Sequence, residues 1–130
     1  MNMEKEKIIY DNQEKVLEKV ILFLKSFLNE DIREAYLFGS IVEKRFGKYI
    51  KKYKVHNGSD IDLIVFLAEG NILKNWKNLN TEKSWWKLYR GGKIEINGTI
   101  HKIDVLVVKK DMEEIAKKSK IFEGEILRIK

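Results

Sequence analysis

Two stretches decide the fold: Leu37-Phe38-Gly39-Ser40, and Gly58-Ser59-Asp60-Ile61-Asp62-Leu63-Ile64-Val65. Apart from its two acids, the second stretch is part of an apolar run that predicts a β-strand over residues 60–67. Side chains two residues apart on a strand point to the same face, so Asp60 and Asp62 are expected side by side. Two carboxylates that close repel each other and lose hydration, and a divalent cation relieves both costs. Because hard oxygen ligands suit magnesium, this stretch predicts a magnesium site.

The first stretch predicts a binding element of a different kind. Residues 32–38 read as a strand, and Gly39-Ser40 then turns the chain into a short helix through Phe46, with Ser40 as its expected cap. Backbone amides and a hydroxyl at such a turn can receive a phosphate. A phosphate seat together with a two-carboxylate metal site indicates chemistry on a nucleoside triphosphate.

A third acid lies far along the chain. Asp104 stands within the β-branched apolar run of residues 99–108, where an isolated charge needs a partner or a metal. If this strand lies beside residues 60–67, Asp104 joins Asp60 and Asp62 and completes the set of carboxylates that two-metal phosphoryl transfer uses. The alternative for each acid taken alone is an ordinary carboxylate of an edge strand or turn.

Composition limits the classes of protein. The chain has 130 residues, 44% of them hydrophobic and 35% charged, which predicts a single domain, 1–130, with a packed core and an ionic surface. A net charge of +6 favours anionic partners such as nucleotides or RNA, although a general lysine bias explains it equally well. The absence of cysteine excludes disulfides and thiolate sites. Without a long apolar run or a signal-peptide core, no membrane contact is predicted and a cytoplasmic location is expected.

Periodicity predicts the remaining elements. Apolar residues at helical spacing predict a helix over residues 12–28, capped by Asp11. Asn97-Gly98 predicts a hairpin that joins residues 93–96 to residues 99–108. Three more helices are expected, over residues 72–79, 81–89 and 111–119, with Trp76, Trp85 and Trp86 as packing residues and Asp111 as the cap of the last.

Residues 47–58 form a basic, aromatic stretch without a clear helical or strand period. We prefer to interpret it as a solvated loop, with a ribbon turning at Asn57-Gly58 as a variant, because lysine runs usually lie on the surface. The alternative is a substrate-contacting loop in which Tyr49 and Tyr53 stack on bases.

These motifs resemble the nucleotidyltransferase domain of the DNA polymerase β superfamily, and most closely its minimal nucleotidyltransferase branch. The resemblance rests on Leu37-Phe38-Gly39-Ser40, Gly58-Ser59-Asp60-Ile61-Asp62-Leu63 and Ile103-Asp104-Val105. It implies an α/β (α+β) fold in which a small mixed β-sheet is flanked by helices. It also implies that Asp60, Asp62 and Asp104 are catalytic and bind Mg2+, expected as two ions, and that Gly39, Ser40 and Ser59 bind the nucleotide. The gap before Asp60 is longer than the family usually shows, which makes residues 47–58 a basic insertion.

The resemblance further implies a magnesium-dependent transferase that moves a nucleoside monophosphate, expected to be AMP from ATP, to a hydroxyl acceptor. Proteins of this branch often act as the antitoxin of a toxin–antitoxin pair with a helical HEPN protein. The alternative is a catalytically weak binding module that neutralises its partner sterically. An RNA-directed protein is a third hypothesis, for which the sequence shows no RNA-module signature. The nucleotide, the acceptor and a homo-oligomeric state stay open.

Overall fold

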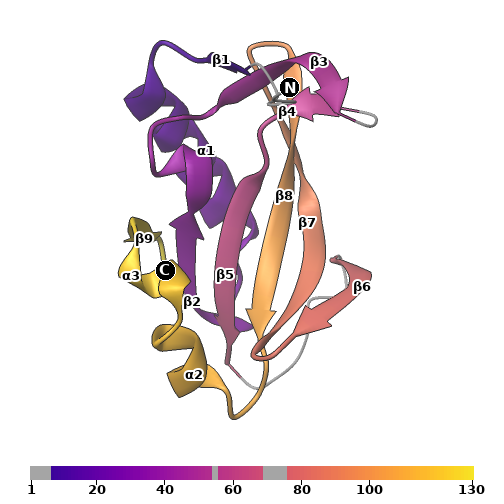
Figure 1. Cartoon of the computed structure of the whole chain (residues 1–130). Coiled ribbons are helices and arrows are strands. Elements are labelled where there is room, and N and C mark those ends of the chain that lie inside the picture. Colours follow the sequence, from indigo (N-terminus) through magenta and orange to yellow (C-terminus); the bar gives the residue numbers. More distant parts are fainter. Residues whose placement is uncertain (1–6, 54–55, 69–75) are drawn as a thin grey trace.

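The computed structural model describes residues 7–53, 56–68 and 76–130, apart from the side chains of residues 27, 51–53, 56 and 57. In this part of the chain the fold is mixed α+β (Figure 1). A six-stranded sheet has the order β6-β7-β8-β5-β2-β9, and a three-stranded sheet has the order β1-β3-β4. In chain order the elements are β1 (Lys7–Ile9), α1 (Gln13–Phe27), β2 (Ile32–Phe38), the 3-10 helix η1 (Gly39–Ile41), β3 (Gly47–Tyr53), β4 (His56–Gly58), β5 (Ile61–Leu67), β6 (Lys77–Lys83), β7 (Trp86–Ile96), β8 (Thr99–Val108), α2 (Glu113–Lys117), α3 (Lys120–Glu123) and β9 (Ile126–Arg128).

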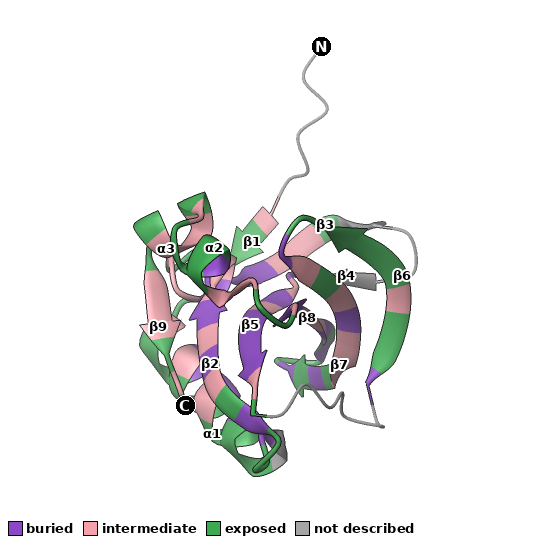
Figure 2. Ribbon diagram, turned by 90° about the horizontal axis from the view of Figure 1, so that it is seen from below, coloured by how far each residue is buried: buried purple, intermediate pink, exposed green. Residues whose placement is uncertain are grey.

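Strand alternation gives the large sheet two apolar faces, with α1 on one side and α2 and α3 on the other (Figure 2). The cluster under α1 includes Val20, Leu24, Leu37, Leu63 and Val105. The opposite cluster includes Ile64, Phe66, Val108, Ala116 and Phe122. Because β5 contributes buried residues to both clusters, Asp62 stands on an otherwise apolar strand, and Asp60 comes directly before that strand.

The strongest local patterns are confirmed. β2 and β5 occupy the two apolar runs, and α1 lies within residues 12–28. The β7–β8 hairpin turns at Asn97 and Gly98, whose φ angles of 51° and 78° are those that a type I′ turn requires. The capping prediction is wrong, because α1 has Asn12 as its N-cap residue and no side-chain cap hydrogen bond.

The helices predicted over residues 72–79 and 81–89 are wrong for their described part, which forms β6 and β7. β7 pairs with β8 over its whole length and with β6 on its other edge, so sheet pairing overrides local helical spacing. The packing role of the tryptophans is confirmed. Trp76 and Trp85 are 7% exposed, and Trp86 packs against the cluster under α2 and α3. Residues 72–75 lie outside the described part.

The solvated loop preferred for residues 47–58 is wrong, whereas the ribbon variant is confirmed in part, because β3 and β4 form a ribbon there and β1 adds a third strand. Asn57-Gly58 lies within β4 instead of at a turn, and residues 54–55 lie outside the description. The pairing with β1 is very close: a Cβ at Gly47 would lie 1.9 Å from the Ile8 carbonyl oxygen. This contact joins segments about forty residues apart, which no local pattern reveals.

The C-terminal segment differs in detail from its prediction. α2 begins at Glu113 after Met112 as its N-cap residue, without a side-chain cap hydrogen bond, so capping by Asp111 is wrong.

The helix expected after Ser40 is reduced to η1, which also lacks a side-chain cap. None of the described helices has the length and apolar character needed to span a bilayer.

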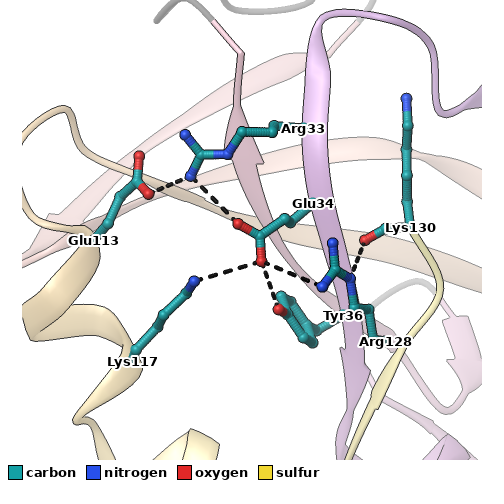
Figure 3. Close-up of polar contacts among 7 residues, drawn as sticks. All are labelled: Arg33, Glu34, Tyr36, Glu113, Lys117, Arg128 and Lys130. Carbon is teal, nitrogen blue, oxygen red and sulfur yellow. Dashed lines mark hydrogen bonds and ion pairs between the residues drawn. The ribbon is translucent and has the colours of Figure 1, made fainter.

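An ion-pair network connects α2 and β9 to β2 (Figure 3). Glu34 accepts a hydrogen bond from the Tyr36 hydroxyl at 2.6 Å. Its carboxylate lies 3.4 Å from Arg33, 3.5 Å from Lys117 and 4.0 Å from Arg128. The network therefore fixes the C-terminal elements on the sheet.

Candidate active site

The parallel pairing of β5 with β8 places Asp62 directly opposite Asp104. The expectation that residues 99–108 lie beside residues 60–67 is therefore confirmed. On its other edge β5 pairs with β2, where Phe38 lies opposite Asp62. Asp62 thus stands between the Gly39 turn and Asp104.

The Asp62 carboxyl group lies in an environment that disfavours its charge. Burial is the largest cause, followed by the carboxylates of Asp60 and Asp104, and together they raise the pKa of Asp62 to about 7. Glu43 acts in the same direction, whereas the ammonium of Lys7 opposes the shift. An additional cation would relieve this repulsion, so the electrostatics favour a positively charged ligand here.

Gly39 lies against the same carboxylate. Its φ of 79° is in the left-handed region, and a Cβ on it would lie 2.6 Å from Asp62 Oδ2. A side chain is therefore excluded by both backbone conformation and space. The half-buried Ser40 follows in η1, so the proposed phosphate seat and Asp62 are neighbours.

Ser59 has a different place from Gly39 and Ser40. It is 2% exposed, and its hydroxyl accepts a hydrogen bond from the Gly47 amide at 3.2 Å. Its own amide donates to the Gly47 carbonyl at 2.9 Å. These two hydrogen bonds join the beginning of β3 to Ser59, which directly precedes Asp60.

His101 is a supporting residue that the motifs do not reveal. Its Nδ1 lies 2.8 Å from the Ser59 carbonyl oxygen, which can only accept, so Nδ1 carries the proton and donates. The Tyr10 hydroxyl lies 2.9 Å from Nε2, and the Phe46 ring centroid lies 4.5 Å from that of His101. His101 thereby holds the backbone that leads into Asp60. Its alternation with Ile103 along the strand was the one available sign that it points into the core.

Arg90 is a second residue that the sequence reasoning missed. Its Nε donates to Asp104 Oδ1 at 2.8 Å from the opposite position on β7. The signal was hidden because the residues just before it were assigned to a helix instead of to the strand beside Asp104. This ion pair gives Asp104 a cationic partner on the neighbouring strand.

The donor set suits magnesium in its chemistry. Asp60, Asp62 and Asp104 supply only hard oxygen atoms, and their mutual repulsion is felt at Asp62. Within residues 7–53, 56–68 and 76–130, however, no three acidic or histidine side chains are gathered closely enough to form a finished metal site. Magnesium binding by these three acids therefore stays a prediction.

Comparison with family models and with curated protein sequences finds no match for this chain.

Proposed function

We propose that this protein is a nucleotidyltransferase that transfers a nucleoside monophosphate, expected to be AMP, from a nucleoside triphosphate to a hydroxyl acceptor. The observation that supports it best is the surroundings of Asp62. Asp104 lies opposite it on the adjacent parallel strand, and the Gly39 backbone lies against its carboxylate. A polymerase β-like fold is part of the proposal, because this is the arrangement that the motif resemblance implies.

Each residue has a distinct role in the proposed reaction. Asp60, Asp62 and Asp104 would hold Mg2+, which when bound would lower the pKa of the acceptor hydroxyl and neutralise the departing pyrophosphate. Gly39 and Ser40 position the triphosphate through backbone amides and the serine hydroxyl.

The chemical step is a substitution at the α-phosphorus. The acceptor hydroxyl passes its proton to the Asp104 carboxylate, the base that the resemblance implies, and its oxygen forms a bond to the α-phosphorus. The bond between that phosphorus and the oxygen bridging to the β-phosphate breaks, and pyrophosphate leaves with the electron pair. Arg90 keeps the Asp104 carboxylate oriented toward the acceptor side of the site.

The acceptor part of the proposal comes from the resemblance alone. In a toxin–antitoxin pair, the hydroxyl acceptor lies on a HEPN-type helical partner, and modification silences that partner. The substrate class is therefore a nucleoside triphosphate together with a protein hydroxyl.

The test is transfer of label from α-labelled ATP with Mg2+ to the partner encoded by the adjacent gene. We expect labelling by the parent protein and none by Asp60→Asn or Asp62→Asn. Asp111→Asn is the matched control, because Asp111 is an exposed acid in the turn before α2. Absence of label on the partner and on RNA with all four nucleotides would contradict the proposal.

A catalytically weak binding module is the second candidate. The Arg90–Asp104 ion pair favours it, because Asp104 already has a cationic partner without metal. The same experiment separates the two candidates. A parent protein that binds and silences the partner but transfers no label would identify a binding module.

A further inference from the structure

β1 carries a cation to the edge of the candidate site. Lys7 lies opposite Tyr49 in the antiparallel pairing of β1 with β3, so both side chains lie on the same face of the small sheet. The Lys7 Nζ lies 5.6 Å from the centroid of the Tyr49 ring, within range of a cation–π interaction. The aromatic ring therefore restricts where the ammonium can lie.

The small sheet is firmly joined to the acidic site. A Cβ at Gly47 would lie 1.9 Å from the Ile8 carbonyl oxygen, so β1 and β3 are in very close contact. Gly47 in turn exchanges two hydrogen bonds with Ser59, through its amide and its carbonyl. Asp60 directly follows Ser59 in the chain. Contacts between backbone segments therefore connect β1 to the first of the acids. The position of Lys7 relative to the site is thus set by backbone contacts.

The charge of Lys7 acts on the site. Its ammonium is attracted by Asp62 and Glu43 and repelled by Arg45. Partial burial is the first cause, and Arg45 the second, that lower the pKa of Lys7. A partly desolvated ammonium that interacts with Asp62 and Glu43 can exchange its lost hydration for contact with a strongly charged anion.

We propose that Lys7 is a ligand of the nucleotide's triphosphate, delivered to the Gly39–Ser40 turn by the three-stranded sheet and oriented by Tyr49. The inference depends on the proposed nucleotidyltransferase site. It gives residues 47–58 a role: β3 and β4 hold the strand that carries this cation. If Lys7 only rested on Tyr49 at the surface, its charge would not affect nucleotide affinity.

The test is calorimetric titration of the full chain with MgATP and, separately, with magnesium and inorganic triphosphate. Lys7→Met should raise both dissociation constants roughly tenfold, which is the loss of affinity expected when one charge-assisted contact is removed. Lys7→Arg should restore most of the affinity, because it keeps the charge. Lys48→Met is the matched control, since Lys48 pairs with Ile8 and points to the opposite face of the small sheet.

The outcomes separate this inference from the proposed function. If Asp62→Asn weakens MgATP binding and Lys7→Met does not, the Lys7 inference is overturned while the proposed function stands. If neither variant changes MgATP binding, both are overturned. If Lys7→Met lowers the affinity for MgATP but not for inorganic triphosphate, the phosphate role of Lys7 is overturned. If Lys48→Met lowers the affinity as much as Lys7→Met does, the effect is one of general charge, and the role of Lys7 is overturned as well. Thermal unfolding of each variant confirms that it is folded before titration.

Discussion

Two carboxylates on neighbouring strands, Glu34 of β2 and Asp62 of β5, have opposite surroundings. Glu34 accepts a hydrogen bond from the Tyr36 hydroxyl, and this bond is the main cause that lowers the pKa of Glu34. Three cations around the Glu34 carboxylate act in the same direction. Asp62 lies among other acids, and burial with the charges of Asp60 and Asp104 raises its pKa. The surroundings therefore favour the charged form of Glu34 and disfavour the charged form of Asp62.

The difference separates a structural cluster from the proposed functional one. The Glu34 network offers every charge a counterpart and connects α2 and β9 to the sheet (Figure 3). The Asp62 cluster keeps a like-charge repulsion that costs stability, and such costs are commonly retained where a ligand later compensates them. Three substitutions test this contrast.

The largest effect is expected from Asp104→Asn, which keeps the size of the side chain and removes its charge. Asp104 acts on the acceptor side of the proposed site, so its loss should appear in the chemical step more than in ground-state binding. We expect turnover to fall on the order of 10²–10³-fold, with the MgATP dissociation constant changed only a few-fold. Single-turnover label transfer and calorimetry measure the two quantities. Equal losses in both would contradict the assigned role, and Asp111→Asn again serves as the control.

The second effect concerns stability and its dependence on pH. Below about pH 4 the Asp62 carboxyl group of the parent is protonated in both the folded and the unfolded state. Its titration then makes no difference to stability, so the parent and Asp62→Asn should be equally stable with respect to this group. As pH rises toward 7 the unfolded chain releases the proton that the folded chain keeps, so the stability of the parent falls.

Without ligand, Asp62→Asn should therefore exceed the parent in free energy of unfolding at pH 8, by at most roughly 4 kcal/mol for a shift of about three pKa units. Urea unfolding at pH 4, 6 and 8 measures this. Magnesium should stabilise the parent more than the variant. A variant less stable than the parent at pH 8 would show that Asp62 is a structural acid like Glu34.

The smallest effect is expected from Glu34→Gln, with the opposite sign. The pKa of Glu34 is lowered in the folded protein. The stabilisation that its charge gives is therefore present above the ordinary pKa of a glutamate and is lost as pH falls through the pKa of the folded state. We expect a loss of about 1 kcal/mol at pH 7 that disappears in acid, with MgATP affinity unchanged. Urea unfolding at pH 7 and pH 3 measures the loss. A change in nucleotide affinity would mean that the two clusters are coupled.

Predictions from local pattern succeeded where one short segment contains all the information. The Asn97-Gly98 turn and the apolar runs of β2 and β5 need only their own residues, because turn geometry and strand alternation are local properties. They failed at residues 81–89, where helical spacing was overridden by pairing with β8. They failed again at residues 47–58, where a segment without a clear period forms strands, one of which pairs with β1.

Residue type and spacing were sufficient to identify the candidate acids, the glycine-serine turn and the strands β2, β5 and β8. Only the tertiary structure decided that Asp104 lies opposite Asp62, since the parallel β5–β8 register joins residues more than forty positions apart. The same holds for Lys7, Arg90 and His101, whose partners are on other elements. Their roles depend on contacts between distant segments, and such contacts form only when burial of the two apolar faces brings the strands together.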